Sequence, residues 1–257
     1  MIFADALLAR RLEAAEAANA RGTSGQAGAA ILEMAGGCAI FVGAESPLTH
    51  AVGVGLNGPV GRGQVDAIET FFRSRGAKST FDLCPLADPG LVEELSRRGY
   101  GIAEFNNVLV RPLAGAEIVL TPRARRAMPG EEDLWSYTVG RGFFEQGELT
   151  TEEMDVGRAI FEMEGAVCYL AATEAGEPAA AAASAYRDGL ATLFADSTIA
   201  GNRRSGLHRE LITARLNEAL ARGCDLATAS TLPGSGSQRN YERMGFQVVY
   251  TKVTMAA

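Results

Sequence analysis

The residues best suited to chemistry lie in one short basic turn, Arg203-Arg204-Ser205-Gly206-Leu207-His208. An apolar run, Leu190 to Ala195, precedes the turn and an amphipathic segment follows it, so the predicted order is strand, turn, helix. A helix N-terminus presents free backbone N–H groups, and the two arginines add positive charge beside them. The turn is therefore predicted to bind an anion such as a phosphate or pyrophosphate.

The helix after the turn must hold that turn in place. Apolar residues recur on one face of it at 3.6-residue spacing, namely Leu207, Leu211, Ile212, Leu216, Ala219 and Leu220. Arg222 and Gly223 form a suitable end, with glycine as the left-handed cap. We expect the polar residues to lie largely off the apolar face; they are Arg209, Glu210, Arg215 and Glu218.

A second reactive side chain, the phenol of Tyr241, opens the hexapeptide Tyr241-Glu242-Arg243-Met244-Gly245-Phe246. Together, Arg203-x-x-Gly206-x-His208 and this hexapeptide resemble two motifs of the GNAT N-acetyltransferase superfamily, [Q/R]-x-x-G-x-[G/A] and Y-E-x-x-G-F. A predicted helix and a short strand, Leu226 to Ser230, separate the two motifs at the family's distance. The sequence departs from the family twice: His208 stands where Gly or Ala is usual, and residues 234–237 lack the usual Asn.

The resemblance implies direct transfer of an acyl group from acetyl-CoA to a small-molecule or peptide amine, without a metal. Pantetheine would pair with the backbone at the end of the first strand as an added strand would, and an N–H there would stabilise the oxyanion. The residues expected to bind acetyl-CoA are Ser197, Thr198, Ile199, Arg203, Arg204, Ser205, Gly206, Leu207, His208 and Ser237.

Two proton transfers need a donor and an acceptor. An alkylamine of pKa about 10.4 must lose a proton before it attacks, and the leaving thiolate, of pKa about 8.5, benefits from gaining one. The resemblance implies Tyr241 as the donor, with packing against the CoA arm as the alternative. Asp196 at the strand end is a candidate base; Glu145, Glu148, His208 and a water chain remain open.

The composition is that of a globular α/β protein. Of 257 residues, 47% are hydrophobic, so the chain can bury a substantial core in one large domain or two smaller ones. With a net charge of -7, the chain lacks the overall positive charge of a nucleic-acid-binding protein, so no nucleic-acid partner is expected. The negative charge suits a cationic amine substrate, although mild acidity is common among proteins. No apolar run reaches the roughly 18 residues that span a bilayer, so no membrane partner is expected.

The four cysteines are far apart and lack metal-ligand spacing. We expect buried, reduced thiols in a cytoplasmic protein. The first 20 residues predict an amphipathic helix rather than a signal peptide. Neither the oligomeric state nor the acceptor follows from these patterns, and a homodimer remains an open alternative.

Three landmarks recur in the two halves at nearly one offset. Arg75-Gly76 precedes Arg222-Gly223 by 147 residues, Gly99-Tyr100 precedes Gly245-Phe246 by 146, and Gly63 precedes Gly206 by 143. This repeat predicts a mixed α/β sheet in two tandem GNAT-like domains, a degenerate one over residues 1–113 and a catalytic one over residues 114–257. In the first half Leu95 stands at the tyrosine position, and the glycine-rich turn 57–63 is either a second phosphate site or a plain turn.

Further expectations concern single segments. Residues 51–56 and 117–121 are predicted strands, and Arg123, Arg125 and Arg126 a solvated edge. Trp135, Tyr137, Phe143 and Phe144 are candidates for the wall of the acceptor site, or else core residues. Two other functions correspond to parts of the sequence. A non-catalytic acyl-CoA-binding or scaffold protein fits the departures at His208 and residues 234–237; a dinucleotide fold fits poorly, because Gly53-x-Gly55 lacks the required turn and helix.

Overall fold

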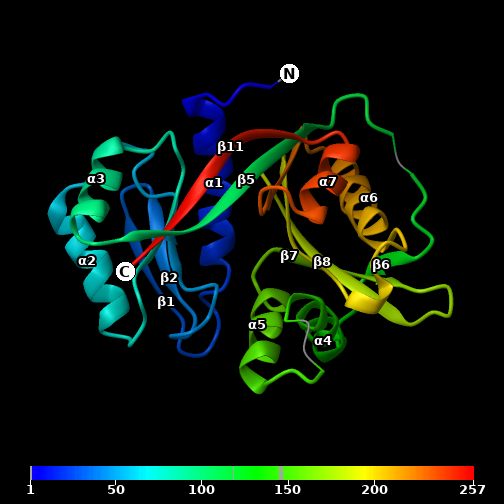
Figure 1. Cartoon of the computed structure of the whole chain (residues 1–257). Helices are drawn as coiled ribbons and strands as arrows, with labels where there is room; N and C mark the ends of the chain where they lie inside the picture. Colours follow the sequence, from blue (N-terminus) through cyan, green and yellow to red (C-terminus); the bar gives the residue numbers. More distant parts are fainter. Residues whose placement is uncertain (1, 118, 145–146) are drawn as a thin grey trace. The chain divides into compact units, whose positions relative to one another are not determined.

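Each half of the fold is built around one pair of parallel strands. β3 (His50–Val52) pairs with β4 (Thr80–Leu83), and β9 (Leu190–Thr198) pairs with β10 (Leu226–Thr231). The computed structural model describes residues 2–117, 119–144 and 147–257. Its contacts define two compact units (Figure 1): unit 1 is Met1–Val108, Thr231–Pro233 and Val248–Ala257, and unit 2 is Leu109–Ser230 and Gly234–Gln247.

Unit 1 contains one sheet with strand order β1-β2-β3-β4-β11-β5. The remaining elements are α1 (Ala6–Arg21), β1 (Ala30–Met34), β2 (Gly37–Phe41), α2 (Arg62–Arg73), α3 (Pro89–Arg97), β5 (Gly101–Pro112) and β11 (Gln247–Ala256). Successive side chains of a strand point to opposite faces, so each strand contributes to two layers. Ala39, Ala51 and Phe81 pack with α2 and α3 on one face, whereas Cys38 and Val52 pack with α1 on the other.

Unit 2 contains a sheet with strand order β5-β10-β9-β8-β7-β6. Its elements are β6 (Ala124–Arg126), α4 (Glu132–Phe143), α5 (Thr151–Phe161), β7 (Ala166–Ala172), β8 (Pro178–Arg187), the 3₁₀ turn η1 (Ala200–Asn202), α6 (Leu207–Ala221) and α7 (Gly236–Arg243). The predicted hairpin of β7 and β8 and the predicted helix α6 are confirmed.

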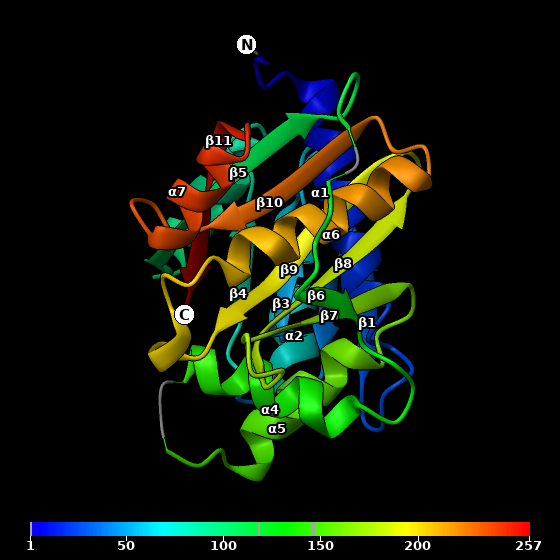
Figure 2. The ribbon, with the colours of Figure 1, turned by 90° about the vertical axis from the view of Figure 1, so that its right-hand side faces the viewer.

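The same alternation builds the core of unit 2. On β8, Ala180 and Ala182 pack with Leu207 and Leu211 of α6, while Ala181 and Ala183 pack with Trp135 of α4. Figure 2 shows α6 in front of β8 and β9, with α4 lower in the same view. Small alanine side chains let both helices approach the sheet closely, and this fixes where α6 begins relative to β9.

The order of elements expected from the repeat is present in both halves, and the last strand of the second repeat lies in unit 1. The order β3-α2-β4-α3-β5 recurs as β9-α6-β10-α7-β11. β11 pairs with β4 in antiparallel register from Val253 opposite Leu83 to Ala256 opposite Thr80, and it lies in unit 1. The end of β5 lies beside β10 in unit 2, where the Thr228 hydroxyl donates to the Leu109 carbonyl at 3.0 Å. The compact units therefore do not coincide with the sequence repeats, because unit 1 contains β11 from Val248 onward and unit 2 contains the end of β5.

Two predicted strands are wrong. β3 stops at Val52 instead of continuing to residue 56, because Gly53 and Gly55 have left-handed φ of 70° and 87°. No strand is present among the described residues of segment 117–121, and the strand β6 begins only at Ala124. The Asn217 side chain takes the place of a strand partner, since it bonds both the N–H and the carbonyl of Val119, at 3.1 and 2.7 Å.

Candidate functional site

A bulge in β9 opens the site. The pairing of β8 with β9 shifts between Ala181 and Ala183, and Ala195 has a left-handed φ of 55°. Such a bulge inserts one residue and changes the direction in which the next side chains point. Within the described residues, the register of β9 with β10 runs only from Leu190 opposite Leu226 to Leu193 opposite Ala229. Beyond Leu193 the two parallel strands separate, which leaves one backbone edge of β9 available to a ligand.

The predicted anion turn lies directly before α6. Arg203 is extended, whereas Arg204 and Gly206 have left-handed φ of 64° and 87°. Gly206 is the N-cap and provides no side chain, so the first N–H groups of α6 are not capped by it. This geometry is a concave row of backbone donors at the positive end of a helix, which suits a phosphate.

The side chains of the turn have separate tasks. Arg203 donates to the carbonyl of Thr198 at 3.3 Å and to that of Gly142 at 3.1 Å, so its guanidinium fastens the turn to the end of β9 and to α4. Arg204 is exposed and can meet a phosphate. Leu207 is buried in the core, so only its backbone could contact a ligand. Ser205 donates to the carbonyl of Asn202 at 2.5 Å.

Arg123 is a part of this turn that sequence reasoning missed. It was expected at a solvated edge, but its Nε pairs with Glu210 at 2.8 Å and its Nη1 donates to the Ser205 carbonyl at 3.1 Å. A Cβ on Gly206 would lie 3.3 Å from Arg123 Nη2. Arg125 and Arg126 pair in turn with Glu131 and Glu218, so the predicted solvated edge is a row of ion pairs.

Behind the turn lies a polar cluster formed by the buried Arg215 and Tyr241 and the partly buried Asp196, His208 and Asn240. Asp196 stands on the bulge and accepts from three neighbours: the Tyr241 hydroxyl at 2.7 Å, His208 Nε2 at 3.0 Å and the Arg215 guanidinium. Asn240 Nδ2 lies 2.9 Å from His208 Nδ1. With that amide donating to Nδ1, the proton of a neutral imidazole lies on Nε2 and points at Asp196.

Arg215 was expected off the apolar face of α6, and that expectation is wrong. Its side chain is 0% exposed, and its Nε and Nη1 donate to the carbonyls of Leu211 and Ala183 at 3.0 and 3.1 Å. A guanidinium can be buried when a carboxylate and carbonyls satisfy its donors. Burial alone would lower the Arg215 pKa, but the charge of Asp196, its hydrogen bond and the nearby Tyr241 together outweigh that effect, and the pKa is raised.

Electrostatics distinguishes the roles of Asp196 and Tyr241. Burial raises the pKa of Asp196, but the charges of Arg215 and His208 and their hydrogen bonds outweigh burial, so the net pKa is lowered. A carboxylate held in this way is a weak base. Burial, reinforced by the charge of Asp196, raises the pKa of Tyr241 well above its usual value, against the opposing effect of Arg215. Tyr241 is therefore protonated at neutral pH and its hydroxyl is a hydrogen-bond donor.

The tyrosine ring is part of the core as well as of the site. Tyr241 is 0% exposed and makes edge-to-face contacts with Phe246 and His208, at centroid distances of 4.9 and 5.6 Å. Ser235 caps α7 by accepting from the N–H of Gln238 at 3.1 Å, which sets where this helix begins. Ser237 is half-buried in the first turn of α7, and a contact between Ser237 and CoA remains a prediction.

The end of β9 packs tightly on α4. Ser197 donates to the carbonyl of Val139 at 2.7 Å, and a Cβ on Gly142 would fall 2.0 Å from Ser197 Oγ. The Ser197 side chain is thus committed to α4, while Thr198 and Ile199 continue the edge toward η1. The N–H of Ile199 donates to the Ala179 carbonyl at 3.0 Å, so that group is already used within the sheet.

The candidate acceptor wall divides into core and surface residues. Trp135 is 0% exposed and donates to the carbonyls of Tyr169 and Ala182, so it is a core residue. Tyr137 and Phe143, also on α4, are 42% and 57% exposed and remain candidates for the wall of the acceptor site.

Among the open candidates for the general base, Glu148 is exposed and Glu145 lies outside the described residues. Over the part of the chain that is described, no three His, Cys, Asp or Glu residues are placed to hold a metal ion.

Comparisons with solved structures give the fold a name. A GCN5-related N-acetyltransferase from Kribbella flavida superposes with a TM-score of 0.69 at 20% identity, covering 95% of both chains. A tandem GNAT protein from the clavulanic acid biosynthesis pathway gives 0.61 at 14% identity, covering 93% of this chain and 87% of that one. A GCN5-related N-acetyltransferase from Sphaerobacter thermophilus gives 0.58 at 14%, covering 89% and 75%.

The sequence alone has no such match. No family model matches it, and no curated protein matches it significantly. Within the described residues, no helix is both long and apolar enough to cross a bilayer. The resemblance drawn from the two motifs is confirmed at the level of the fold, and the chain has the mixed α/β fold of the tandem GNAT proteins.

Proposed function

We propose that the chain is an N-acyltransferase that moves an acetyl group from acetyl-CoA to an amine, with one working site in unit 2. One observation carries the proposal: the separation of β9 from β10 directly beside the uncapped N-terminus of α6. A strand edge that can pair with the amides of pantetheine and a helix end that can hold a pyrophosphate then serve the same elongated ligand.

In this proposal the backbone of residues 204–208 holds the pyrophosphate. Left-handed Arg204 and Gly206 shape the turn, the positive end of α6 attracts the charge, and the exposed Arg204 side chain adds a charge-assisted contact. Arg203 and Arg123 hold the turn in place through carbonyl contacts. The thioester would follow the free edge of β9 toward Asp196 and Tyr241.

Tyr241 is proposed to stabilise the leaving thiolate. Its pKa is raised well above 10, whereas a thiol of the CoA type has a pKa of about 8.5, so complete proton transfer from the phenol would be uphill by more than about 2 kcal/mol. A hydrogen bond to the developing thiolate avoids that cost. The amine, which loses a proton as the amide forms, is the source of the proton that the thiolate finally takes.

Asp196 is proposed to position Tyr241 rather than to act as the base. Its lowered pKa and its three donors leave little tendency to accept a proton from an ammonium group. Arg215 keeps the carboxylate charged, and it shares Oδ1 with His208, while Oδ2 accepts from Tyr241. His208, which departs from the family motif, therefore has a structural reason to be at that position.

A second candidate function is binding of acyl-CoA without turnover. The observation in its favour is that Tyr241 is 0% exposed and its hydroxyl is already bonded to Asp196. A tyrosine that stays in this arrangement would support the core and would not reach a thiolate. Both candidates use the same turn, so binding of acetyl-CoA does not distinguish them.

Release of CoA thiol distinguishes the two functions. The protein is incubated with acetyl-CoA and separate pools of amino acids, polyamines, peptides with a free N-terminus and lysine-containing peptides, and free thiol is measured over time. Amine-dependent release that scales with protein concentration supports the enzyme. Saturable binding of acetyl-CoA in calorimetry without release from any pool supports the binding protein, and absence of binding contradicts both.

A further inference from the structure

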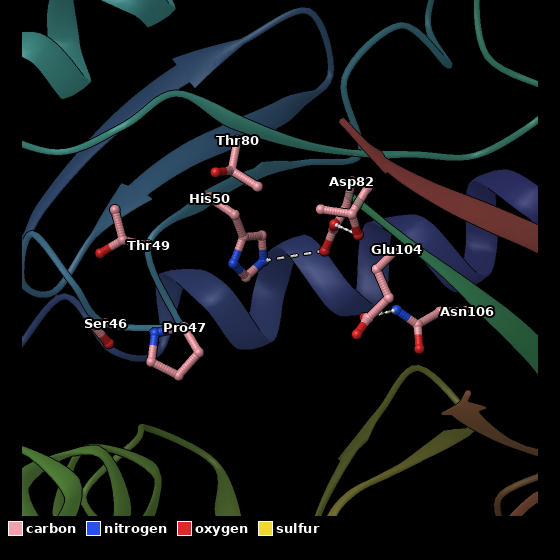
Figure 3. A pocket seen from close by; sticks show the side chains of 9 residues that line it. Ser46, Pro47, Thr49, His50, Thr80, Asp82, Glu104 and Asn106 are labelled. Atoms are coloured by element: carbon pink, nitrogen blue, oxygen red, sulfur yellow. Dashed lines mark hydrogen bonds and ion pairs between the residues drawn. The ribbon is translucent and has the colours of Figure 1, made fainter. Parts of the chain in front are cut away.

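A polar pocket in unit 1 has no part in the proposed reaction. It is a cavity of about 230 Å³ on one face of the unit 1 sheet (Figure 3). Its lining comes from four neighbouring strands: His50 on β3, Thr80 and Asp82 on β4, Thr254 on β11, and Glu104 and Asn106 on β5. Residues far apart in the chain thus converge on one surface.

The side-chain alternation explains why these groups share a face. Ala51, Phe81 and Met255 point into the apolar core beneath α2 and α3, so their neighbours His50, Asp82 and Thr254 point to the other face. On that second face Val52, which pairs with Asp82, packs with α1, whereas His50, Thr80, Asp82 and Thr254 line the pocket. A sheet face that packs against protein is normally apolar, so these polar side chains face solvent, and the hollow that they line is open to a polar ligand.

The charge of the pocket selects cations. Asp82 and Glu104 contribute two carboxylates, and the lining contains no lysine or arginine. The nearby Lys252 on β11 is already paired with Glu13 and Glu16, at 3.0 and 2.7 Å. Burial raises the pKa of Asp82, but His50, Lys252 and the Thr254 hydrogen bond outweigh it, so the net pKa is lowered and the carboxylate is charged at neutral pH.

The pocket also offers hydrogen-bonding groups at spacings that a ligand can use. Asp82 Oδ2 lies 3.8 Å from His50 Nε2, too far for a direct hydrogen bond. The two side chains are only 24% and 19% exposed, so they line a hollow and not an open surface. Thr254 donates to Asp82 Oδ1 at 2.6 Å, and Asn106 donates to Glu104 at 2.5 Å; both contacts orient the carboxylates.

We propose that this cavity, the unit 1 pocket, binds a small hydroxyl-bearing ammonium compound. Its volume equals that of about seven or eight liquid waters, which admits a molecule of roughly six to eight non-hydrogen atoms. A metal ion fits less well, because among the described residues no three acidic, His or Cys side chains converge on one point. The carboxylates would hold the ammonium group, and the Thr, His and Asn side chains would bond the hydroxyls. The proposal does not depend on the acyl-transfer function.

The probe is 2-amino-1,3-propanediol, with glycerol and glycerate as neutral and anionic compounds of matched size. Each is titrated into the ¹⁵N-labelled full chain while amide chemical shifts are followed. The amine is expected to shift amides in segments 46–50, 80–82 and 104–106 with a dissociation constant on the order of 1 mM. Equal binding of glycerol or glycerate, or shifts confined to unit 2, would overturn the proposal.

Variants test the carboxylates directly. Glu104→Gln removes an exposed charge and is expected to weaken amine binding at least about tenfold, since a charge-assisted hydrogen bond is lost. Asp82→Asn should also weaken amine binding at least about tenfold, provided that the variant folds. Glu93→Gln, an equal change at an exposed position of α3, should leave binding unchanged. Unaltered binding in Glu104→Gln, or an equal loss in Glu93→Gln, would contradict the assignment.

Discussion

The Tyr241 hydroxyl donates to Asp196 Oδ2 at 2.7 Å, although the two residues are 45 positions apart in the chain. The contact depends on the bulge at Ala195, which turns Asp196 toward α6 and α7. Arg215 joins the pair, with Nη2 at 3.4 Å from the same hydroxyl. The phenol is thereby held by a charged partner on each side, at the end of β9 where the parallel strands separate.

Replacing Tyr241 by Phe should lower turnover about 10²-fold, because the group that stabilises the thiolate is removed. Affinity for acetyl-CoA should change less than about twofold, since the pyrophosphate turn is untouched. Tyr186→Phe is the matched control: it removes another, partly buried tyrosine hydroxyl of unit 2, which accepts from Ser184 at 2.8 Å and donates to the Arg215 carbonyl at 3.2 Å. Steady-state rates that are equal in wild type and Tyr241→Phe would remove Tyr241 from the reaction.

Asp196→Asn should destabilise the protein by about 3–5 kcal/mol, because it leaves the 0% exposed guanidinium of Arg215 without its counter-charge. Combining Asp196→Leu with Arg215→Met removes both charges and should recover a large part of that loss. Urea unfolding of wild type and of the single and double variants measures their free energies of unfolding. If the single variant is as stable as wild type, the ion pair does not support the site as described.

The ion pair also predicts a pH dependence. The folded-state pKa of Asp196 is lowered, so its contribution to stability is present above the unfolded value of about 3.9 and is lost as pH falls below it. The free energy of unfolding of wild type should therefore drop more steeply below about pH 4 than that of Asp196→Asn. Parallel curves for the two proteins would show that Asp196 is not stabilised in the folded state.

Charge reversal at Arg204 should weaken acetyl-CoA binding at least about tenfold, since an attractive contact with the pyrophosphate becomes repulsive. Arg73→Glu makes the same change of charge at an exposed position of α2 in unit 1 and should leave binding unchanged. Isothermal titration calorimetry measures the affinity of both variants and of wild type for acetyl-CoA. Equal affinities for Arg204→Glu and wild type would mean that the pyrophosphate lies elsewhere.

The cysteines should be inert in the native protein. All four are buried, and burial raises the pKa of Cys38 and Cys84 to about 11 and that of Cys168 to about 12. At pH 8 only about one in a thousand of the Cys38 and Cys84 thiols would be ionised, so iodoacetamide should label them only after unfolding. Rapid native labelling of any of these three thiols, followed by mass spectrometry, would contradict their burial.

Local patterns were enough to predict the elements that flank the site. The 3.6-residue spacing in α6, the hairpin of β7 and β8, and Gly206 before a helix each depend on residues close in sequence. The repeat was visible because Gly76, Gly99, Gly223 and Gly245 follow the ends of corresponding helices, whereas Gly63 lies within α2 and the counterpart of the N-cap Gly206 is Gly61. These features suffice to predict a glycine-bearing turn at the start of α6.

The interior of the site could not be predicted, because it depends on partners distant in sequence. A charged residue in a helix is expected in solvent, and Arg215 is buried only because the bulge brings Asp196 to it from β9. Asn240 on α7 likewise contacts the ring of His208 on α6, a partner 32 residues away in the sequence. The pairing of β11 with β4 was equally hidden, since a strand has the same local pattern whichever strand it pairs with.

The most direct test of the account is the affinity of acetyl-CoA for two glycine variants, measured by calorimetry. Gly206 and Gly223, at opposite ends of α6, have left-handed φ of 87° and 73°, so alanine at either should cost about 1 kcal/mol of stability. Only at Gly206 would the added Cβ lie in the proposed pyrophosphate turn. The account predicts at least about a tenfold loss of affinity in Gly206→Ala and none in Gly223→Ala; equal affinities in the two variants would contradict it.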